Sequence, residues 1–146
     1  MKTLIFNGSP RENGNTVSLI NKATEKIAGE YKVINAYRCN ISPCVDCRYC
    51  WDHTGCAIED EMQEVYKYIR ECDNILIASP VYFSELTGKL LDVGSRLQTY
   101  YCSAVFRKER PVLKEPCTST NHESIERPTS FEYKPPFFLH EQNFCK

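Results

Sequence analysis

The sequence predicts an α/β fold built on a parallel β-sheet. Three short apolar runs have the composition of β-strands, and amphipathic stretches with helical spacing separate them. A further amphipathic stretch follows the last strand. Strands that alternate with helices are typical of a parallel sheet with crossover helices on both faces. We therefore expect ligands to bind beyond the carboxyl ends of the strands, where the winding reverses.

The predicted strands are "TLIFN" (3–7), "YKVINAY" (31–37) and "NILIASP" (74–80). The last of these is nearly all apolar, which predicts a strand buried on both faces. The predicted helices span residues 15–29, 59–72 and 85–102, where apolar residues recur three or four positions apart. Gly29 is the expected stop of the first helix.

The charge balance and the hydropathy pattern exclude several classes of protein. The 18 Lys and Arg residues face 19 Asp and Glu residues, so the chain lacks the basic excess of a nucleic-acid binder. No apolar run approaches the ~20 residues that a membrane span needs. The apolar stretch at the N-terminus is too short for a signal peptide. We expect a cytoplasmic protein without a nucleic-acid or membrane partner.

The turn "FNGSPRENGNT" (6–16) leads from the first strand into the first helix, which excludes a hairpin. Unpaired N–H groups at a helix N-terminus bind anions. The turn adds hydroxyl, amide and cationic donors and two glycines: Ser9, Thr16, Asn15, Arg11, Gly8 and Gly14. A phosphate monoester fits this set, although an ordinary capped helix with a polar loop is the alternative. The turn matches neither G-x-G-x-x-G nor a Walker A sequence.

Nine cysteines are a high count for 146 residues, and Cys44, Cys47, Cys50 and Cys56 fall within one short segment. Their C-x2-C-x2-C-x5-C spacing lets a single loop supply three corners of a cubane cluster and a fourth thiolate close it. Zinc sites more often use two separated C-x2-C pairs. The spacing favours a [4Fe–4S] cluster, with zinc and free or redox-active thiols as the open alternatives.

Three segments together resemble a known family. The segments are "GSPRENGNT" (8–16), "SPVYFSELTGKLLD" (79–92) and "PCVDCRYCWDHTGCAIEDEM" (43–62). The first two resemble the NADPH-dependent FMN reductase family of flavodoxin-like proteins, and the third resembles its iron–sulfur flavoprotein branch. The matches cover roughly residues 1–105. The resemblance implies a doubly wound parallel sheet with three clear strands in the order 2-1-3.

The resemblance also implies the cofactors and their ligands. It implies FMN held through its phosphate by Ser9, Arg11, Gly14, Asn15 and Thr16, and through its ring by Pro80, Val81, Tyr82 and Phe83. It implies a [4Fe–4S] cluster on Cys44, Cys47, Cys50 and Cys56. The cofactors would carry the electrons, so we expect no catalytic side chains. The electron donor would be NAD(P)H or a ferredoxin-like protein, and the family's cluster loop, which reaches the flavin of a neighbouring subunit, implies a homo-oligomer.

The sequence departs from the family after about residue 107. Residues 107–146 are rich in proline, serine and threonine and have no clear period, so we expect an irregular or disordered tail. We expect that the C-terminal part of the family fold is lost or altered, and an incomplete sheet would leave its third strand as an exposed apolar edge. We divide the chain into an FMN-binding domain (1–106), with a cysteine-rich loop at 39–57, and the tail.

The sequence therefore predicts an FMN-dependent oxidoreductase or electron-transfer flavoprotein with a [4Fe–4S] cluster. Two alternatives stay open. One is a clusterless NAD(P)H-dependent FMN or quinone reductase, and the other is a non-enzymatic zinc-binding or interaction module. Whether the chain is an enzyme is itself left open.

Overall fold

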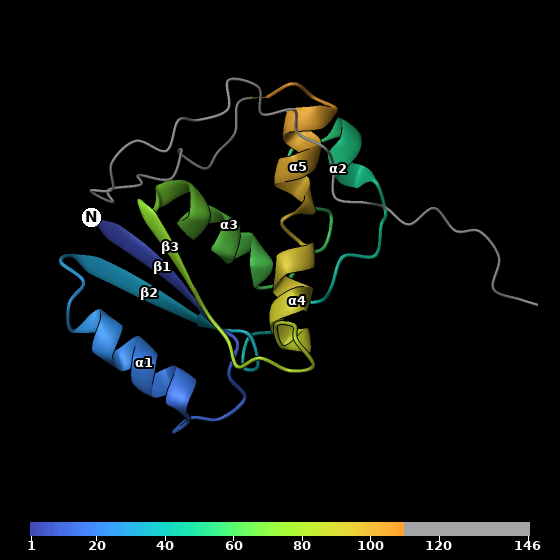
Figure 1. Cartoon of the computed structure of the whole chain (residues 1–146). Helices are drawn as coiled ribbons and strands as arrows, with labels where there is room; N and C mark the ends of the chain where they lie inside the picture. Colours follow the sequence, from blue (N-terminus) through green and yellow to red (C-terminus); the bar gives the residue numbers. More distant parts are fainter. Residues whose placement is uncertain (110–146) are drawn as a thin grey trace, which may run out of the picture. The chain divides into compact units, whose positions relative to one another are not determined.

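The computed structural model of the chain describes residues 1–109, and these form an α/β unit around a three-stranded parallel sheet (Figure 1). The strands are β1 (Lys2–Asn7), β2 (Glu30–Asn35) and β3 (Asn74–Ala78). Their order is β2-β1-β3, which confirms the predicted fold class and strand order. In the sheet Ile5 pairs with Val33 on one side and with Leu76 on the other.

The helices are α1 (Asn15–Thr24), α2 (Tyr49–Asp52), α3 (Met62–Glu71), α4 (Gly88–Ser95) and α5 (Gln98–Val105). Helix α1 lies on one face of the sheet, and α3 and α4 lie on the other (Figure 1). The first crossover runs from β1 to β2 and the second runs back from β2 past β1 to β3, so right-handed connections place their helices on opposite faces of the sheet. The carboxyl ends of all three strands therefore meet at one edge, where the winding reverses.

Two helix boundaries differ from the prediction. The predicted helix 85–102 is split into α4 and α5. At the break, the N–H groups of Arg96 and Leu97 donate to the carbonyls of Val93 and Gly94, three residues earlier and not four as in an α-helix. Gly94 and Ser95 have weak helix preference, which favours a break there. Helix α1 ends at Thr24 and not near Gly29. Gly29 has φ 120° and turns the chain into β2, in a conformation that favours glycine.

The main core lies between the sheet and α3 and α4. Central strand β1 is buried from Thr3 to Asn7, and it contributes Leu4 and Phe6 to this core. The other apolar members are Ala36, Ile41, Met62, Val65, Tyr66, Ile69, Leu90 and Val93. The amphipathic face that the sequence predicts for residues 59–72 supplies four of them, so this prediction is confirmed.

The prediction that the third strand is buried on both faces is wrong. Ile75 is 38 % exposed and Ile77 is 56 % exposed, because β3 has β1 as its one partner among residues 1–109. The side chains of Phe6, Leu90, Leu97 and others line an apolar groove of about 470 Å³ next to these two isoleucines. The expectation of an exposed apolar edge at this strand is confirmed for the described residues.

No helix within residues 1–109 has the length and apolar character needed to cross a membrane. The predicted irregular tail, apart from its first three residues, lies outside the described residues.

Candidate functional site

A pocket of about 330 Å³ opens at the carboxyl ends of β1 and β3. It joins the two segments that the sequence singled out, since the loop after β1 and the loop after β3 both line it. Its lining residues are Ser9, Pro10, Arg11, Asn13, Gly14, Asn15, Thr16, Pro80 and Tyr82. All five predicted phosphate-binding residues therefore lie around one space, together with two of the four predicted ring-binding residues.

Hydrogen bonds between backbone groups and the side chains of Asn7 and Ser9 give the loop after β1 its shape. The Ser9 N–H donates to Asn7 Oδ1 (2.9 Å), and the Arg11 N–H donates to Ser9 Oγ (3.2 Å). Ser9 is buried and its hydroxyl donates to the Arg11 carbonyl (3.1 Å). Ser9 therefore orders the loop with the hydroxyl that the sequence offered as a phosphate donor.

The first turn of α1 is open toward this pocket. Gly14 occupies the N-cap position, where no side chain caps the helix. The first N–H groups of a helix have no partner within the helix and carry partial positive charge. A Cβ on Gly14 would lie 3.3 Å from Arg11 Cβ, so glycine keeps the turn compact. These backbone donors suit an oxyanion.

Arg11 supplies the positive side chain of the pocket. It is exposed and forms no ion pair with another residue in the part of the chain that the structure describes. The neighbouring Glu12 is paired with Arg38 at 2.6 Å, so that carboxylate is engaged elsewhere. Arg11 is thus available to an anionic ligand.

The loop after β3 ends in a tight turn. Tyr82 and Glu85 exchange two backbone hydrogen bonds (2.9 and 3.0 Å), and Phe83 (φ 51°) and Ser84 (φ 64°) occupy its two central positions. Positive φ at both positions is typical of a type I′ turn and is unusual for a bulky residue such as Phe. Phe83 and Val81 are exposed and do not line the pocket, in contrast to Pro80 and Tyr82.

Thr87, at the N-cap of α4, connects the two loops, and the sequence analysis did not identify it. Its buried hydroxyl donates to the Gly8 carbonyl (2.7 Å), and its N–H donates to Ser79 Oγ (3.2 Å). Gly8 also donates its N–H to the Ala78 carbonyl (2.8 Å). A Cβ at Gly8 would lie 2.7 Å from Leu90 Cδ2 and 3.0 Å from the hydroxyl oxygens of Ser79 and Thr87, so glycine favours the close approach of these elements.

The four predicted ligands Cys44, Cys47, Cys50 and Cys56 all line a second, smaller pocket, and all four are free thiols. Asp46 (φ 50°) and Arg48 (φ 61°) lie between successive cysteines and curl the loop by adopting left-handed backbone conformations. The open space is only about 20 Å³, and within residues 1–109 no three potential ligands are already grouped around a metal position. The donor chemistry fits a thiolate-bound centre, and the loop must rearrange to bind one.

Burial changes the pKa of one of these thiols, Cys50. It raises the pKa of Cys50 to about 12, and a hydrogen bond with the neighbouring Cys102 thiol acts in the same direction. A metal ion binds the thiolate form, so it must displace this proton. Cys50 is thus protonated at neutral pH in the metal-free chain.

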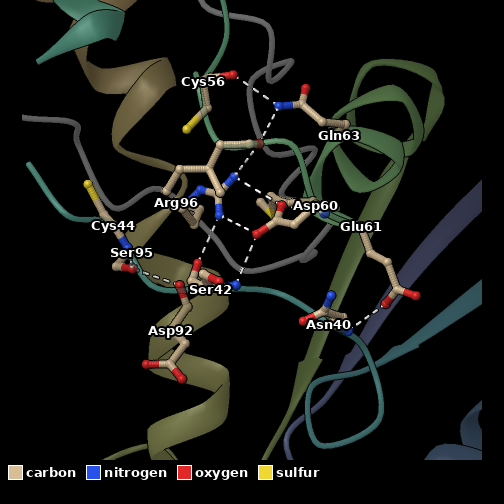
Figure 2. A network of polar contacts seen from close by, with 12 residues as sticks. Asn40, Ser42, Cys44, Cys56, Asp60, Glu61, Gln63, Asp92, Ser95 and Arg96 are labelled. Atoms are coloured by element: carbon tan, nitrogen blue, oxygen red, sulfur yellow. Dashed lines mark hydrogen bonds and ion pairs between the residues drawn. The ribbon is translucent and has the colours of Figure 1, made fainter. Parts of the chain in front are cut away.

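Arg96 is the centre of the polar network that holds the cysteine loop (Figure 2). It is 1 % exposed and forms a two-pronged ion pair with Asp60 (2.7 and 3.1 Å). The same guanidinium donates to the carbonyls of Ser42 (2.8 Å) and Ile58 (3.2 Å). Ser42 precedes Cys44 and Ile58 follows Cys56, so one side chain ties together the segments on both sides of the four predicted ligands.

The electrostatics of the ion pair follow from these contacts. Burial by itself would raise the pKa of Asp60, but hydrogen bonds from Arg96 and from the N–H groups of Ser42 and Met62 hold it below its ordinary value. Sequence reasoning missed Arg96. A signal was present, because Arg96 lies three residues after buried Val93 in an apolar pattern.

Similarity to known proteins identifies the family of the chain. The model of the NADPH-dependent FMN reductase family matches residues 1–112. An iron–sulfur flavoprotein of Methanocaldococcus jannaschii is 36 % identical, over 62 % of this chain and 48 % of that protein. An iron–sulfur flavoprotein of Methanosarcina thermophila is 34 % identical, over 78 % of this chain and 58 % of that protein.

A putative NAD(P)H-dependent FMN-containing oxidoreductase of Bacillus subtilis is 28 % identical, over 62 % of this chain and 48 % of that protein. The chain thus spans about half the length of the curated relatives it matches. The family match covers the two loops of the larger pocket, the cysteine loop and the three-stranded sheet. The chain belongs to the NADPH-dependent FMN reductase family.

Proposed function

We propose that the chain binds FMN in the pocket between the loops after β1 and β3 and serves as a flavin-dependent oxidoreductase. One observation carries the proposal: the open N-terminus of α1, the exposed cation Arg11 and the loop after β3 surround the same space of about 330 Å³. Bound FMN would supply the redox chemistry, and the protein would bind and orient it. The family supports a nicotinamide nucleotide as electron donor.

The phosphate of FMN would be held by the loop after β1. Arg11 would pair with it, the first N–H groups of α1 at Asn15 and Thr16 would donate to it, and Gly14 would leave room for it. Ser9 would act through the loop that its hydroxyl already orders.

The flavin ring would lie along the loop after β3. Pro80 and Tyr82 line the pocket and offer apolar and aromatic surface to a flat ring. We also propose Val81 and Phe83 as ring contacts: the same loop exposes both outside the pocket lining, so they would contact a part of the ring that extends beyond the pocket.

The test compares FMN with riboflavin, which lacks the phosphate. Arg11→Gln should weaken FMN binding by about ten- to a hundredfold, because a charge-assisted contact to phosphate contributes about 1.5–3 kcal/mol. Riboflavin binding should change little. Quenching of flavin fluorescence on titration measures both affinities. The matched control, Lys26→Gln, removes an exposed cation that does not line the pocket. Equal losses for FMN and riboflavin would contradict the phosphate assignment, and no binding of either would contradict the function.

We propose that Cys44, Cys47, Cys50 and Cys56 bind a [4Fe–4S] cluster that exchanges electrons with the flavin. The four thiols around one pocket support this assignment, and so do the names of the iron–sulfur flavoprotein relatives. Such thiols require a reducing compartment, so we place the protein in the cytoplasm. Iron, acid-labile sulfide and zinc per chain after anaerobic purification test the assignment.

The alternative is a clusterless FMN or quinone reductase. It is favoured by the thiols of residues 44–56, which are not grouped around a metal position in the described part of the chain. Flavin without iron or sulfide would support this alternative. Zinc at one equivalent without flavin would support a zinc-binding module instead.

We also propose that the chain forms a homo-oligomer. The edge strand β3 exposes Ile75 and Ile77 beside an apolar groove, and such an edge favours association. Sedimentation equilibrium should show an oligomer for the wild type and dissociation for Ile77→Lys. A monomeric wild type would contradict the proposal.

A further inference from the structure

The helix pair α4–α5 forms the support of the cysteine loop, and Arg96 is its buried centre. Ser95 Oγ accepts a hydrogen bond from the N–H of Cys44 (3.0 Å), and Thr99 Oγ1 donates to the Gly55 carbonyl (2.9 Å). Arg107, after α5, donates to the Cys50 carbonyl. Arg96 differs from these neighbours because it is charged and almost completely buried.

The ion pair with Asp60 does not use the whole guanidinium. Nη1 and Nη2 are engaged by Asp60, Ser42 and Ile58, whereas Nε is buried and has no hydrogen-bond partner among residues 1–109. A buried donor without a partner costs free energy, so it calls for a functional reason. An acceptor that arrives with a ligand would satisfy it.

In the Arg96–Asp60 ion pair, Arg96 is the partner that lies toward the cysteines. Arg96 lines the pocket together with all four thiols, and Asp60 does not. Figure 2 shows the Arg96 side chain between Asp60 and the cysteines Cys44 and Cys56. The positive end of the pair thus faces the thiols, and the negative end faces the N–H groups of Ser42 and Met62.

We propose that Arg96 is a positioning residue for a thiolate-bound metal or iron–sulfur centre in the cysteine loop: it ties the two ends of the loop together and compensates the negative charge of the ligated thiolates. The inference rests on the cysteine site of the proposed function. Four thiolates around a divalent metal ion carry a net charge of −2, which a fixed cation beside them stabilises. The Nε–H is the donor that remains free for a ligand sulfur.

The probe is Co²⁺ alone, added under anaerobic, reducing conditions to the full metal-free chain. Cobalt bound by thiolates gives a sulfur-to-metal charge-transfer band, and the band intensity gives the affinity. Arg96→Met removes the cation, and we expect it to weaken Co²⁺ binding by at least about tenfold. Arg96→Lys keeps the positive charge but cannot form the two parallel hydrogen bonds to Asp60, so we expect a smaller loss of Co²⁺ affinity.

Asp60→Asn separates the electrostatic role from a merely structural one. This variant disturbs the same network but removes the carboxylate that partly neutralises Arg96. The positive charge of Arg96 should therefore stabilise the thiolates more strongly. We expect Co²⁺ binding equal to or tighter than that of the wild type. If Arg96 served only to hold the loop, both Arg96→Met and Asp60→Asn would weaken binding. Lys89→Met is the matched control, since it removes an exposed cation of α4 that does not line the pocket.

The outcomes are distinct. A charge-transfer band in the wild type that Arg96→Met leaves within twofold overturns the role of Arg96 and leaves the cysteine site intact. Weaker binding in Asp60→Asn overturns the charge compensation. No band in the wild type overturns the thiolate centre itself and the inference with it. If Arg96→Met does not fold, as judged by circular dichroism, Arg96→Lys and Asp60→Asn decide the question by their opposite expected effects.

Discussion

The two loops that carry the proposed chemistry are built in different ways. The pocket beyond β1 and β3 is shaped by the ends of sheet strands, by the N-terminus of a helix and by the close contact at Gly8. The cysteine loop 39–57 contains one short helix and is held by side chains of α4, of α5 and of the turn between them. The first offers a ligand mainly backbone N–H groups at the end of a sheet, whereas the second is held in place by a few polar side chains.

This difference predicts how each region responds to change. Backbone donors at the end of a rigid sheet are in place before a ligand arrives, which is the arrangement that favours tight, specific binding. The cysteines face one small space but are not grouped around a metal position within the described residues, so metal binding must reorganise the loop. We therefore expect loss of an exposed side chain of the phosphate pocket to change the stability of the chain little, and the stability of the cysteine loop to depend strongly on Arg96.

The largest expected effect on stability is that of Arg96→Met. It leaves the Asp60 carboxylate buried without its partner, and breaking a buried ion pair in this way costs about 3–5 kcal/mol of unfolding free energy. Arg11→Gln, in the other loop, should change the free energy by less than about 0.5 kcal/mol, since Arg11 is exposed and unpaired among residues 1–109. Urea unfolding of both variants measures the contrast. If both variants lost a similar amount of unfolding free energy, the proposed difference between the two loops would not hold.

Gly8→Ala should give the next largest effect and tests the close contact at Gly8. The added Cβ would lie 2.7 Å from Leu90 Cδ2 and 3.0 Å from both Ser79 Oγ and Thr87 Oγ1. The two hydroxyls are fixed by hydrogen bonds, so we expect a loss of about 1–3 kcal/mol and weaker flavin binding. Thermal unfolding with and without FMN measures both effects. The control is Gly88→Ala, which has open space around its Cβ position; equal losses would argue against a tight junction.

Sequence reasoning predicted the parts of the molecule that depend on local pattern. The amphipathic face of α3, with Met62, Val65, Tyr66 and Ile69, and the glycine-rich turn before α1 have clear periods or turn residues. The resemblance added the strand order and the pairing of two distant loops. The meeting of Ser9 and Tyr82 in one pocket depends on the sheet order β2-β1-β3, because parallel strands end at the same edge.

The features that the sequence analysis missed depend on tertiary contacts. The burial of β3 could not be judged from its apolar composition, since it depends on whether a further strand covers the edge. Thr87 donates a hydrogen bond to Gly8, which lies 79 positions earlier in the sequence, and Arg96 pairs with Asp60, which lies 36 positions earlier. A buried arginine at an apolar helix position is a detectable signal, but its partner Asp60 is visible only in the fold.

The smallest effect, and the one that most sharpens the comparison, is the response of the Arg96–Asp60 pair to acid. The pKa of Asp60 lies below its ordinary value in the folded chain, whereas it is about 3.9 when unfolded. A carboxylate with a lowered folded pKa contributes stability above its unfolded pKa and loses it as the pH falls through the folded pKa. The gap in unfolding free energy between the wild type and Asp60→Asn should therefore be constant from pH 7 to about pH 5 and narrow below about pH 4. Other carboxylates titrate in both proteins, so the difference isolates this one group.

Urea unfolding at several pH values measures the gap. The control is Asp92→Asn, which removes the carboxylate of a partly exposed surface pair with Lys89, so its gap to the wild type should be small at every pH. A gap for Asp60→Asn that stayed constant down to pH 3 would mean that the buried pair contributes no more than a surface pair. The cysteine loop would then depend on its backbone, as the phosphate pocket does, and the contrast between the two loops would not hold.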